Sequence, residues 1–452
     1  MKAISSRIWF AMAVISLQAA LALWAGLPGQ VSTDSIVQMY EGLSHQTISF
    51  NPALMAVILG VLDTLGSAPI GFVFLSQALF SGALWLAFGG RLTQGRWWQF
   101  LVALVLVCNP VILAYTGIVW KDILFAHAAV LVFLLISHWL EHKTKPGALL
   151  IGLVILLMTI VVGVRQQGLL FVVVAAWWLA VLLSKKRLHA FALVVPLILA
   201  PLFINKIVTE TVQKPLDDPL AGSVVGFKIL MQYDLVGIVV NGGALPVRDP
   251  GTAEGKAIAE LSKQVPLYSG YRVDTLINPS PNFWSMPLAE TATLWREGVV
   301  QYPTAYVKHR WHQARTFLGL EDVRLCAPIF SGIGGPLQHP LVQQELTSVL
   351  GLQPGMNHSS QFVIETMWDL AKTPLLMHWA YLLVLLLIAV VLLIQKRYVL
   401  LSLVGCCFAY FGSYFVLGIA CDFRYGYVLT ASSSVLAVAA LFGRPKGAAI
   451  AS

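Results

Sequence analysis

Long apolar runs separated by short polar loops make up most of this 452-residue chain. Most runs contain about 17 to 25 residues, enough for a helix to cross about 30 Å of hydrocarbon. Backbone groups that face lipid must bond within their own segment, so this pattern predicts a polytopic α-helical membrane protein with about ten transmembrane helices. The runs are residues 8–27, 69–89, 98–116, 123–140, 147–163, 168–184, 188–207, 373–394, 398–418 and 425–443.

Two segments depart from this pattern. Residues 52–65 are apolar but too short for a full crossing, and they include Asp63, so we expect an interfacial helix there. In residues 208–372, charged residues, Pro and Gly return and apolar positions become periodic, which predicts an extramembrane, mostly α-helical domain. The expected parts are membrane helices in 1–207, with a first outer loop at 28–68, the domain at 208–372 and membrane helices in 373–452.

Charge gives the chain an orientation. The chain is 58% hydrophobic and only 11% charged, and its net charge of +8 is spread over short loops instead of one nucleic-acid-binding face. By the positive-inside rule these loops are cytoplasmic. We therefore expect a multi-pass protein of a bacterial inner membrane, with both chain ends cytoplasmic, an uncleaved first span, residues 208–372 periplasmic and no nucleic-acid partner. The basic loop residues are Lys2, Arg7, Arg91, Arg96, Lys143, Lys145, Lys185–Arg187, Lys396, Arg397, Arg444 and Lys446.

Charged and polar residues also gather at the outer ends of the predicted helices, where a bilayer protein places them at some cost. Each turn has a simple explanation: Asp34 or Thr33 can cap a helix over 35–44, neighbouring opposite charges can neutralise each other, and an Arg can reach lipid phosphates. If the helices form a bundle, however, the turns can converge on one polar site. The turns carry Asp34; Lys121 and Asp122; Arg165, Gln166 and Gln167; and Asp422, Arg424 and Tyr425.

A site of this composition has a chemical logic. A carboxylate can act as a general base towards a hydroxyl, while Arg and Lys hold a phosphate as it becomes a leaving group. In residues 208–372, the spacing predicts a helix over 302–318 with one apolar face, including Val307 and Trp311, and one basic face, including Lys308 and Arg310. That basic face either binds anionic headgroups or is simply solvated.

Together these residues resemble the GT-C class of membrane glycosyltransferases, which use polyprenyl-phosphate-linked sugars, and within it a group of largely uncharacterised bacterial proteins. The resemblance spans most of the chain, although Asn51 stands where the pattern has His, and Asp34 lacks the adjacent second acid of some relatives. The matching features are Asp34, Asn51 with Pro52, Trp120 to Asp122, Arg165 to Leu169, Tyr302 to Arg310, and Arg424 with Tyr425.

The resemblance implies that a sugar passes from a polyprenyl-phosphate donor to a lipid, glycan or protein acceptor at the outer membrane face, with inversion. Asp34 would be the general base, and Asp122 would orient Lys121 or contact the sugar or a metal. Whether the site binds a divalent cation, Mg²⁺ or Mn²⁺, stays open, because Asp34 and the distant Asp122 supply few oxygen ligands. The implied substrate- and phosphate-binding residues are Lys121, Arg165, Gln166, Gln167, Lys308, Arg310, Arg424 and Tyr425.

Two other functions stay open at this point. A lipid or polysaccharide transporter predicts charges near the middle of the spans, whereas residues 154–157 and 383–387 are apolar. An O-antigen ligase or polymerase would instead use the helix over 302–318. Cys326 and Cys421 are both expected on the outer side, where they either form a disulfide or remain free thiols.

Overall fold

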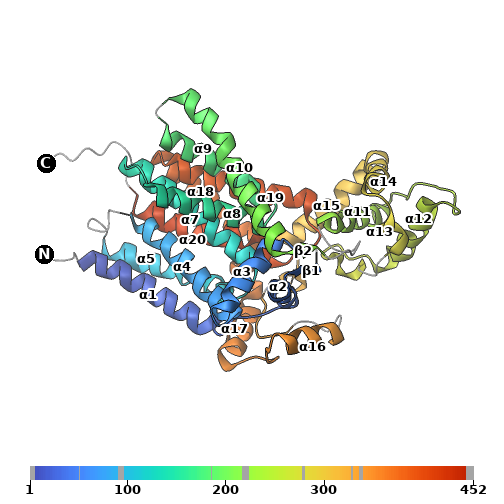
Figure 1. Cartoon of the computed structure of the whole chain (residues 1–452), viewed down its shortest axis with the longest axis horizontal. Coiled ribbons are helices and arrows are strands. Elements are labelled where there is room, and N and C mark those ends of the chain that lie inside the picture. Colours follow the sequence, from blue (N-terminus) through green and yellow to red (C-terminus); the bar gives the residue numbers. More distant parts are fainter. Residues whose placement is uncertain are drawn as a thin grey trace.

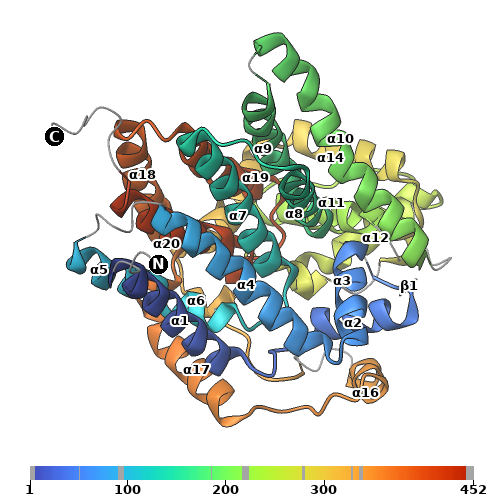
Figure 2. The same cartoon turned by 60° about the vertical axis from the view of Figure 1, so that its left-hand side comes forward.

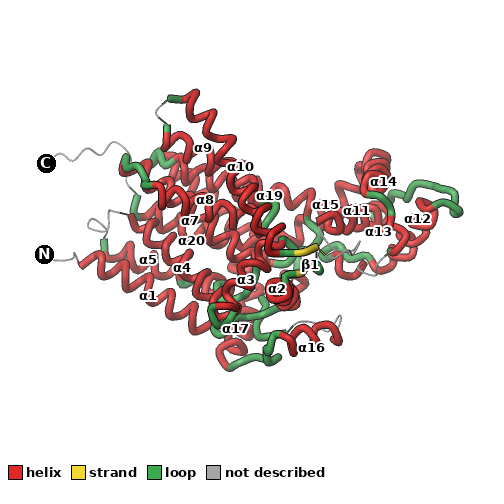
Figure 3. Tube along the Cα trace, viewed as in Figure 1, coloured by secondary structure: helices red, strands yellow, loops and turns green. Residues whose placement is uncertain are grey.

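The computed structural model describes residues 6–49, 51–89, 96–184, 186–215, 223–276, 280–326, 329–334 and 340–443. The chain is predominantly helical, and its apolar helices form the bundle at the left of Figure 1 (Figures 1 and 3). Within the described residues, five helices are long and apolar enough to cross a membrane: α1 (Ser6–Gly26), α4 (Ala68–Phe88), α7 (Lys121–His142), α10 (Arg187–Val212) and α19 (Tyr398–Leu417). Shorter apolar helices accompany them: α3 (Ala53–Thr64), α5 (Trp97–Val107), α8 (Ala148–Val164), α9 (Gly168–Leu183), α18 (His378–Ile394) and α20 (Tyr427–Leu441).

Helix α7 forms the centre of this bundle. Almost all of its side chains are buried, and α4, α8, α9, α19 and α20 pack around it (Figure 2). The outer surface of the bundle is also apolar: the side chains of Val105, Leu149 and Leu188 are 75%, 87% and 80% exposed. Water disfavours so large an apolar surface, whereas hydrocarbon accommodates it. The fold thus agrees with an α-helical membrane protein.

The predicted continuous helix over 98–116 is wrong. Helix α5 ends at Val107, and a separate helix, α6 (Pro110–Tyr115), follows. Pro110 has no backbone N–H to continue α5, and the Asn109 side chain accepts a hydrogen bond of 2.9 Å from the Val111 amide, which caps α6. The helix expected from residue 373 likewise starts late, at His378, after the 3₁₀ turns η5 (Leu370–Lys372) and η6 (Pro374–Leu376).

The loop after α1 contains two packed helices, α2 (Thr33–Ser44) and the predicted short helix α3. They approach closely because both carry glycine at the contact: a Cβ on Gly60 would lie 2.7 Å from the Gly42 carbonyl oxygen. Strand β1 (Gln46–Thr47) pairs in parallel with β2 (Lys214–Pro215). This pairing ties the loop to the end of α10, which continues beyond its predicted end at residue 207.

The segment expected as a domain, residues 208–372, contributes to three hydrophobic cores. Helices α11 to α15, which we call the α11–α15 lobe, project at the right of Figure 1, and α11 to α14 bury side chains such as Tyr233 and Phe283 in a core of their own. Phe317 of α15 and Cys326 belong to a small third core, and Met367 and Ala371 belong to the core of the apolar bundle. The elements are α11 (Ser223–Val240), α12 (Ala253–Gln264), η2 (Val265–Leu267), η3 (Val273–Leu276), α13 (Pro281–Ser285), α14 (Leu288–Gln301), α15 (Pro303–Leu318), η4 (Val323–Cys326), α16 (Pro340–Val349) and α17 (His358–Asp369).

Helix α15 forms where expected, but its predicted faces are only partly right: Ala314 and Phe317 are buried and Lys308 is exposed as predicted, whereas other positions are reversed. Val307 and Trp311 are 51% and 53% exposed, whereas His309 and Arg310 are fully buried. The reason is Asp234 of α11, whose carboxylate lies 2.5 Å from an Arg310 guanidinium nitrogen and 3.1 Å from His309 Nε2. A buried partner from another helix therefore turns two basic residues inward.

Candidate functional site

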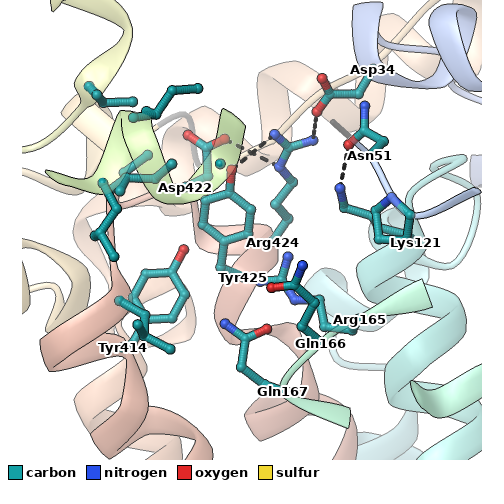
Figure 4. Close-up of a pocket in the computed structure, with 18 of the residues that line it drawn as sticks. Asp34, Asn51, Lys121, Arg165, Gln166, Gln167, Tyr414, Asp422, Arg424 and Tyr425 are labelled. Atoms are coloured by element: carbon teal, nitrogen blue, oxygen red, sulfur yellow. Dashed lines mark hydrogen bonds and ion pairs between the residues drawn. The ribbon is translucent and has the colours of Figure 1, made fainter. Parts of the chain in front are cut away.

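A cavity of about 330 Å³ lies where the predicted outer turns of the bundle meet the α11–α15 lobe. Six separate turns or helix ends of the bundle supply its polar side chains, and α11 and η3 close it from the lobe (Figure 4). The expected convergence of these turns is therefore present in the structure. The polar lining comprises Asp34, Asn51, Lys121, Arg165, Gln166, Gln167, Asp274, Tyr414, Asp422, Arg424 and Tyr425.

Asp34 faces this cavity because another residue caps its helix. The N-cap of α2 is Ser32, not Asp34 or Thr33 as predicted, and the Ser32 amide donates to Ser35 Oγ at 3.2 Å. Ser35 Oγ in turn donates to the Val119 carbonyl at 2.6 Å, which fixes the start of α2 against the turn before α7. The Asp34 side chain, 40% exposed, is thus available to a ligand.

Arg424 is the central cation of the cavity. It lies in the turn η7 (Phe423–Gly426), with Nη1 2.6 Å from Asp34 Oδ2 and Nε 3.2 Å from Asp422 Oδ2 (Figure 4). Its guanidinium carbon also lies 4.8 Å from the ring centre of Trp120 and 5.0 Å from that of Tyr425. Two carboxylates and two aromatic faces hold Arg424 in a fixed direction.

Lys121 enters from the first residue of α7. Its ammonium group donates to Asn51 Oδ1 at 2.5 Å, so Asn51 is a hydrogen-bond partner of the lysine (Figure 4). The preceding residue, Trp120, is fixed by an indole N–H bond of 2.8 Å to Ser32 Oγ. Asn51 and Ser32 thus position both residues of the Trp–Lys turn.

Arg165 and Asp122 form a second ion pair at the wall of the cavity. Arg165 Nη1 lies 2.8 Å from Asp122 Oδ1, and Nη2 donates to the Tyr410 hydroxyl at 3.0 Å. The Asp122 side chain is only 3% exposed and does not line the cavity, whereas Arg165 does. Asp122 therefore orients Arg165, a partner that the sequence analysis did not assign to it.

The carboxyl groups of the cavity differ in their proton affinity. Burial disfavours the charge on Asp34, but Arg424 and Lys121 together outweigh burial and lower the pKa of Asp34. Burial dominates at Asp422 and raises its pKa to about 6, with Arg424 opposing and Asp274 reinforcing the rise. At neutral pH the base candidate Asp34 is ionised, whereas Asp422 takes up a proton as the pH falls through about 6.

The lobe contributes a residue that the sequence analysis missed. Asp274, in η3, is exposed and lines the cavity, whereas Lys308 and Arg310 of α15 do not. Lys308 is exposed outside the cavity, and Arg310 is buried against Asp234. No motif surrounds Asp274, so only the pairing of Cys326 with Cys421 could have indicated that the lobe approaches this site.

Those two cysteines form a disulfide, which resolves the open alternative (S–S 2.13 Å). Among the described residues, no group of three or more His, Cys, Asp or Glu side chains is arranged to hold a metal ion. The cavity residues thus do not fit a divalent cation, and we derive no step through one.

Comparison of the chain with protein-family models, with curated proteins and with solved structures finds no match. The function is therefore inferred from the residues and geometry of the cavity.

Proposed function

We propose that this chain is a membrane glycosyltransferase of the GT-C type, with about ten spans in a bacterial inner membrane and the cavity at the periplasmic face. The apolar surface of the bundle supports the membrane location. The basic loops support cytoplasmic chain ends, because along the sequence they alternate with the turns that line the cavity.

The observation that carries the proposal is the meeting of Asp34 with Lys121, Arg165 and Arg424 in one cavity. These residues come from four places in the sequence, and their chemistry is that of phosphate departure assisted by a base. A phosphodiester between a polyprenyl chain and a sugar presents one anionic phosphate to such cations. Arg424 and Lys121 would bind that phosphate, and Arg165 would complete its surroundings from the wall.

In the proposed reaction, the acceptor hydroxyl oxygen attacks the anomeric carbon while its proton passes to Asp34. The Arg424 ion pair engages Oδ2, so Oδ1 is the oxygen that would accept this proton. The bond between the anomeric carbon and the phosphate oxygen breaks, and its electron pair leaves with the polyprenyl phosphate. Direct attack inverts the anomeric centre.

The cavity favours this proposal over the two rivals. A ligase that used the α15 helix would need its basic residues near the site, whereas Arg310 and His309 are buried against Asp234. For a transporter, the buried intramembrane histidine His127 would be a candidate relay. It instead has both ring nitrogens bonded, to Ser76 and to the Tyr427 hydroxyl.

The test is transfer of radiolabelled sugar from polyprenyl-phosphate donors to native membranes by purified protein. We expect Asp34→Asn to lower the transfer rate by about 10²- to 10⁴-fold, the usual contribution of a general base. Donor affinity should not fall, because the amide oxygen can still accept from Arg424 while the cavity loses one negative charge that competes with the donor phosphate.

The matched control is Asp63→Asn, which changes an exposed aspartate of the same outer loop that does not line the cavity. It should transfer sugar at the wild-type rate. Equal transfer by wild type and Asp34→Asn would refute the assigned base. Absence of transfer with every donor, together with donor movement across vesicle membranes, would favour a transporter instead.

A further inference from the structure

The short segment Gly418–Asp422 joins α19 to the turn that carries Arg424, and its backbone is bonded to the α11–α15 lobe. Residues next to η3 form an antiparallel bridge with it. The Val273 amide donates to the Ile419 carbonyl at 2.8 Å, and the Cys421 amide donates to the Tyr271 carbonyl at 3.0 Å. Both hydrogen bonds involve residues 271–273, which immediately precede Asp274 and place it at the cavity.

Helix α15 holds two further carbonyl groups of the same segment. Arg310 Nη1 donates to the Gly418 carbonyl at 2.5 Å, and Gln313 Nε2 donates to the Ala420 carbonyl at 3.2 Å. Both side chains are fully buried, so water does not compete for these bonds. Behind Arg310, Asp234 fixes the guanidinium from α11.

A covalent bond completes the attachment. The disulfide from Cys326, the last residue of η4, ends on Cys421, the residue before Asp422 and three before Arg424. Every residue from Gly418 to Cys421 is thus bonded to the lobe or the adjoining turn, and the next residues are the two charged groups of the cavity.

We propose that Arg310, Gln313 and the Cys326–Cys421 disulfide are positioning elements, through which the lobe sets the place of Asp422 and Arg424 in the cavity. The inference rests on the proposed function for its effect on donor binding, but its structural part does not. Ligand-binding groups have to be held within about 0.5 Å of their working positions, and a five-residue connection without a helix or strand cannot do this alone. The segment obtains its rigidity from the lobe.

Gln313→Leu tests this with little change in volume. The substitution removes the bond to Ala420, and hydrogen exchange measured by mass spectrometry should become at least several-fold faster in peptides covering residues 418–425. Equilibrium binding of glucosyl farnesyl phosphate, a short phosphodiester, should weaken by about 3- to 10-fold, the effect of losing one buried hydrogen bond.

The matched control is Gln264→Leu. Gln264 is also a buried glutamine of the lobe, but its side-chain amide is bonded to Ser280 and Gln232 instead of the 418–422 segment. It reports any general loosening of the lobe. Exchange in residues 418–425 and donor binding should both stay at the wild-type level in this variant.

A second arm uses the disulfide in the unaltered protein. Dithiothreitol should speed exchange in residues 418–425 and weaken donor binding in wild type, but should change neither in the double variant Cys326→Ser, Cys421→Ser. Unchanged exchange in Gln313→Leu and in reduced wild type, or an equal response of Gln264→Leu, would overturn the inference. So would faster exchange with unaltered affinity.

The two proposals fail differently. If wild-type protein binds no polyprenyl phosphodiester while exchange still responds to Gln313→Leu and to reduction, the lobe positions the segment and the glycosyltransferase proposal is the one that fails.

Discussion

Two Asp–Arg clusters in this molecule have nearly the same composition and opposite surroundings. In the cavity cluster, Arg424 lies between Asp34 and Asp422, and the Asp34 side chain is 40% exposed. In the lobe cluster, Arg310 and Asp234 have no exposed side-chain surface and are joined by His309. In the Asp34–Arg424 pair, either residue is accessible enough to give up the other for a ligand. The Asp234–Arg310 pair is inaccessible and stabilises the fold.

The different burial of the two clusters shows that a basic residue in an extramembrane segment is not necessarily a ligand-binding residue. Arg310 and Arg424 were both candidate phosphate ligands in the sequence, and the residues adjacent to each in the chain did not distinguish a structural arginine from a binding one. What separates them is whether a carboxylate partner encloses the guanidinium completely. Enclosure removes it from solvent and converts a binding group into a structural one.

The largest effect that we expect from the difference between the two clusters is on the free energy of unfolding. Asp234→Asn leaves Arg310 buried without its counter-charge, which should cost about 3 to 5 kcal/mol of stability. Chemical denaturation in detergent measures the loss, and Asp249→Asn, an exposed aspartate of the same lobe, is the control. If Asp234→Asn lowered the free energy of unfolding as little as Asp34→Asn does, the lobe cluster would not be more important for stability than the cavity cluster.

The next effect concerns ligand binding. Arg424→Ala removes the central cation of the cavity, and affinity for glucosyl farnesyl phosphate should fall by roughly 10- to 100-fold, the worth of charge-assisted hydrogen bonds to phosphate. Isothermal titration measures the affinity. Arg324→Ala, which breaks an exposed ion pair with Asp322 outside the cavity, should leave it unchanged. Equal affinities in wild type and Arg424→Ala would remove the cavity cluster from donor binding.

The smallest effect is one of pH. Because the raised pKa of Asp422 is about 6, its carboxyl is ionised above and neutral below that pH, while Asp34 stays ionised through this range. Protonation of Asp422 releases Arg424 from one of its two carboxylates, so phosphodiester affinity should rise by several-fold between pH 7 and pH 5. Asp274, whose pKa is also raised, and Lys121 face the same space.

Asp422→Asn is the decisive comparison, since it mimics the neutral carboxyl at every pH. It should bind at pH 7 as wild type does at pH 5, with most of the pH dependence gone. A wild-type profile in this variant would assign the titration to another group, and Asp274→Asn would then identify whether it is that one.

Sequence patterns predicted the helices well where the pattern was continuous. Apolar runs located α4, α8 and α19 within a few residues, and charged turns indicated the cavity cluster, because both signals are local. The break at Asn109 was missed, since apolar residues on both sides masked a proline and its cap. The inward turn of Arg310 and the approach of Asp274 depend on partners far away in sequence, Asp234 and the 418–422 segment, and no local pattern contains them.

The Asp34–Arg424 pair also has a consequence for how the protein is made. Its two residues are 390 positions apart, and translation at about 5 to 20 residues per second separates their synthesis by roughly 20 to 80 s. During that interval a growing chain already has its base candidate but lacks the central cation. The cavity cluster is therefore incomplete in nascent chains and in chains that terminate before Arg424, and the transfer that we propose could begin only after Cys421 and Arg424 have joined the rest.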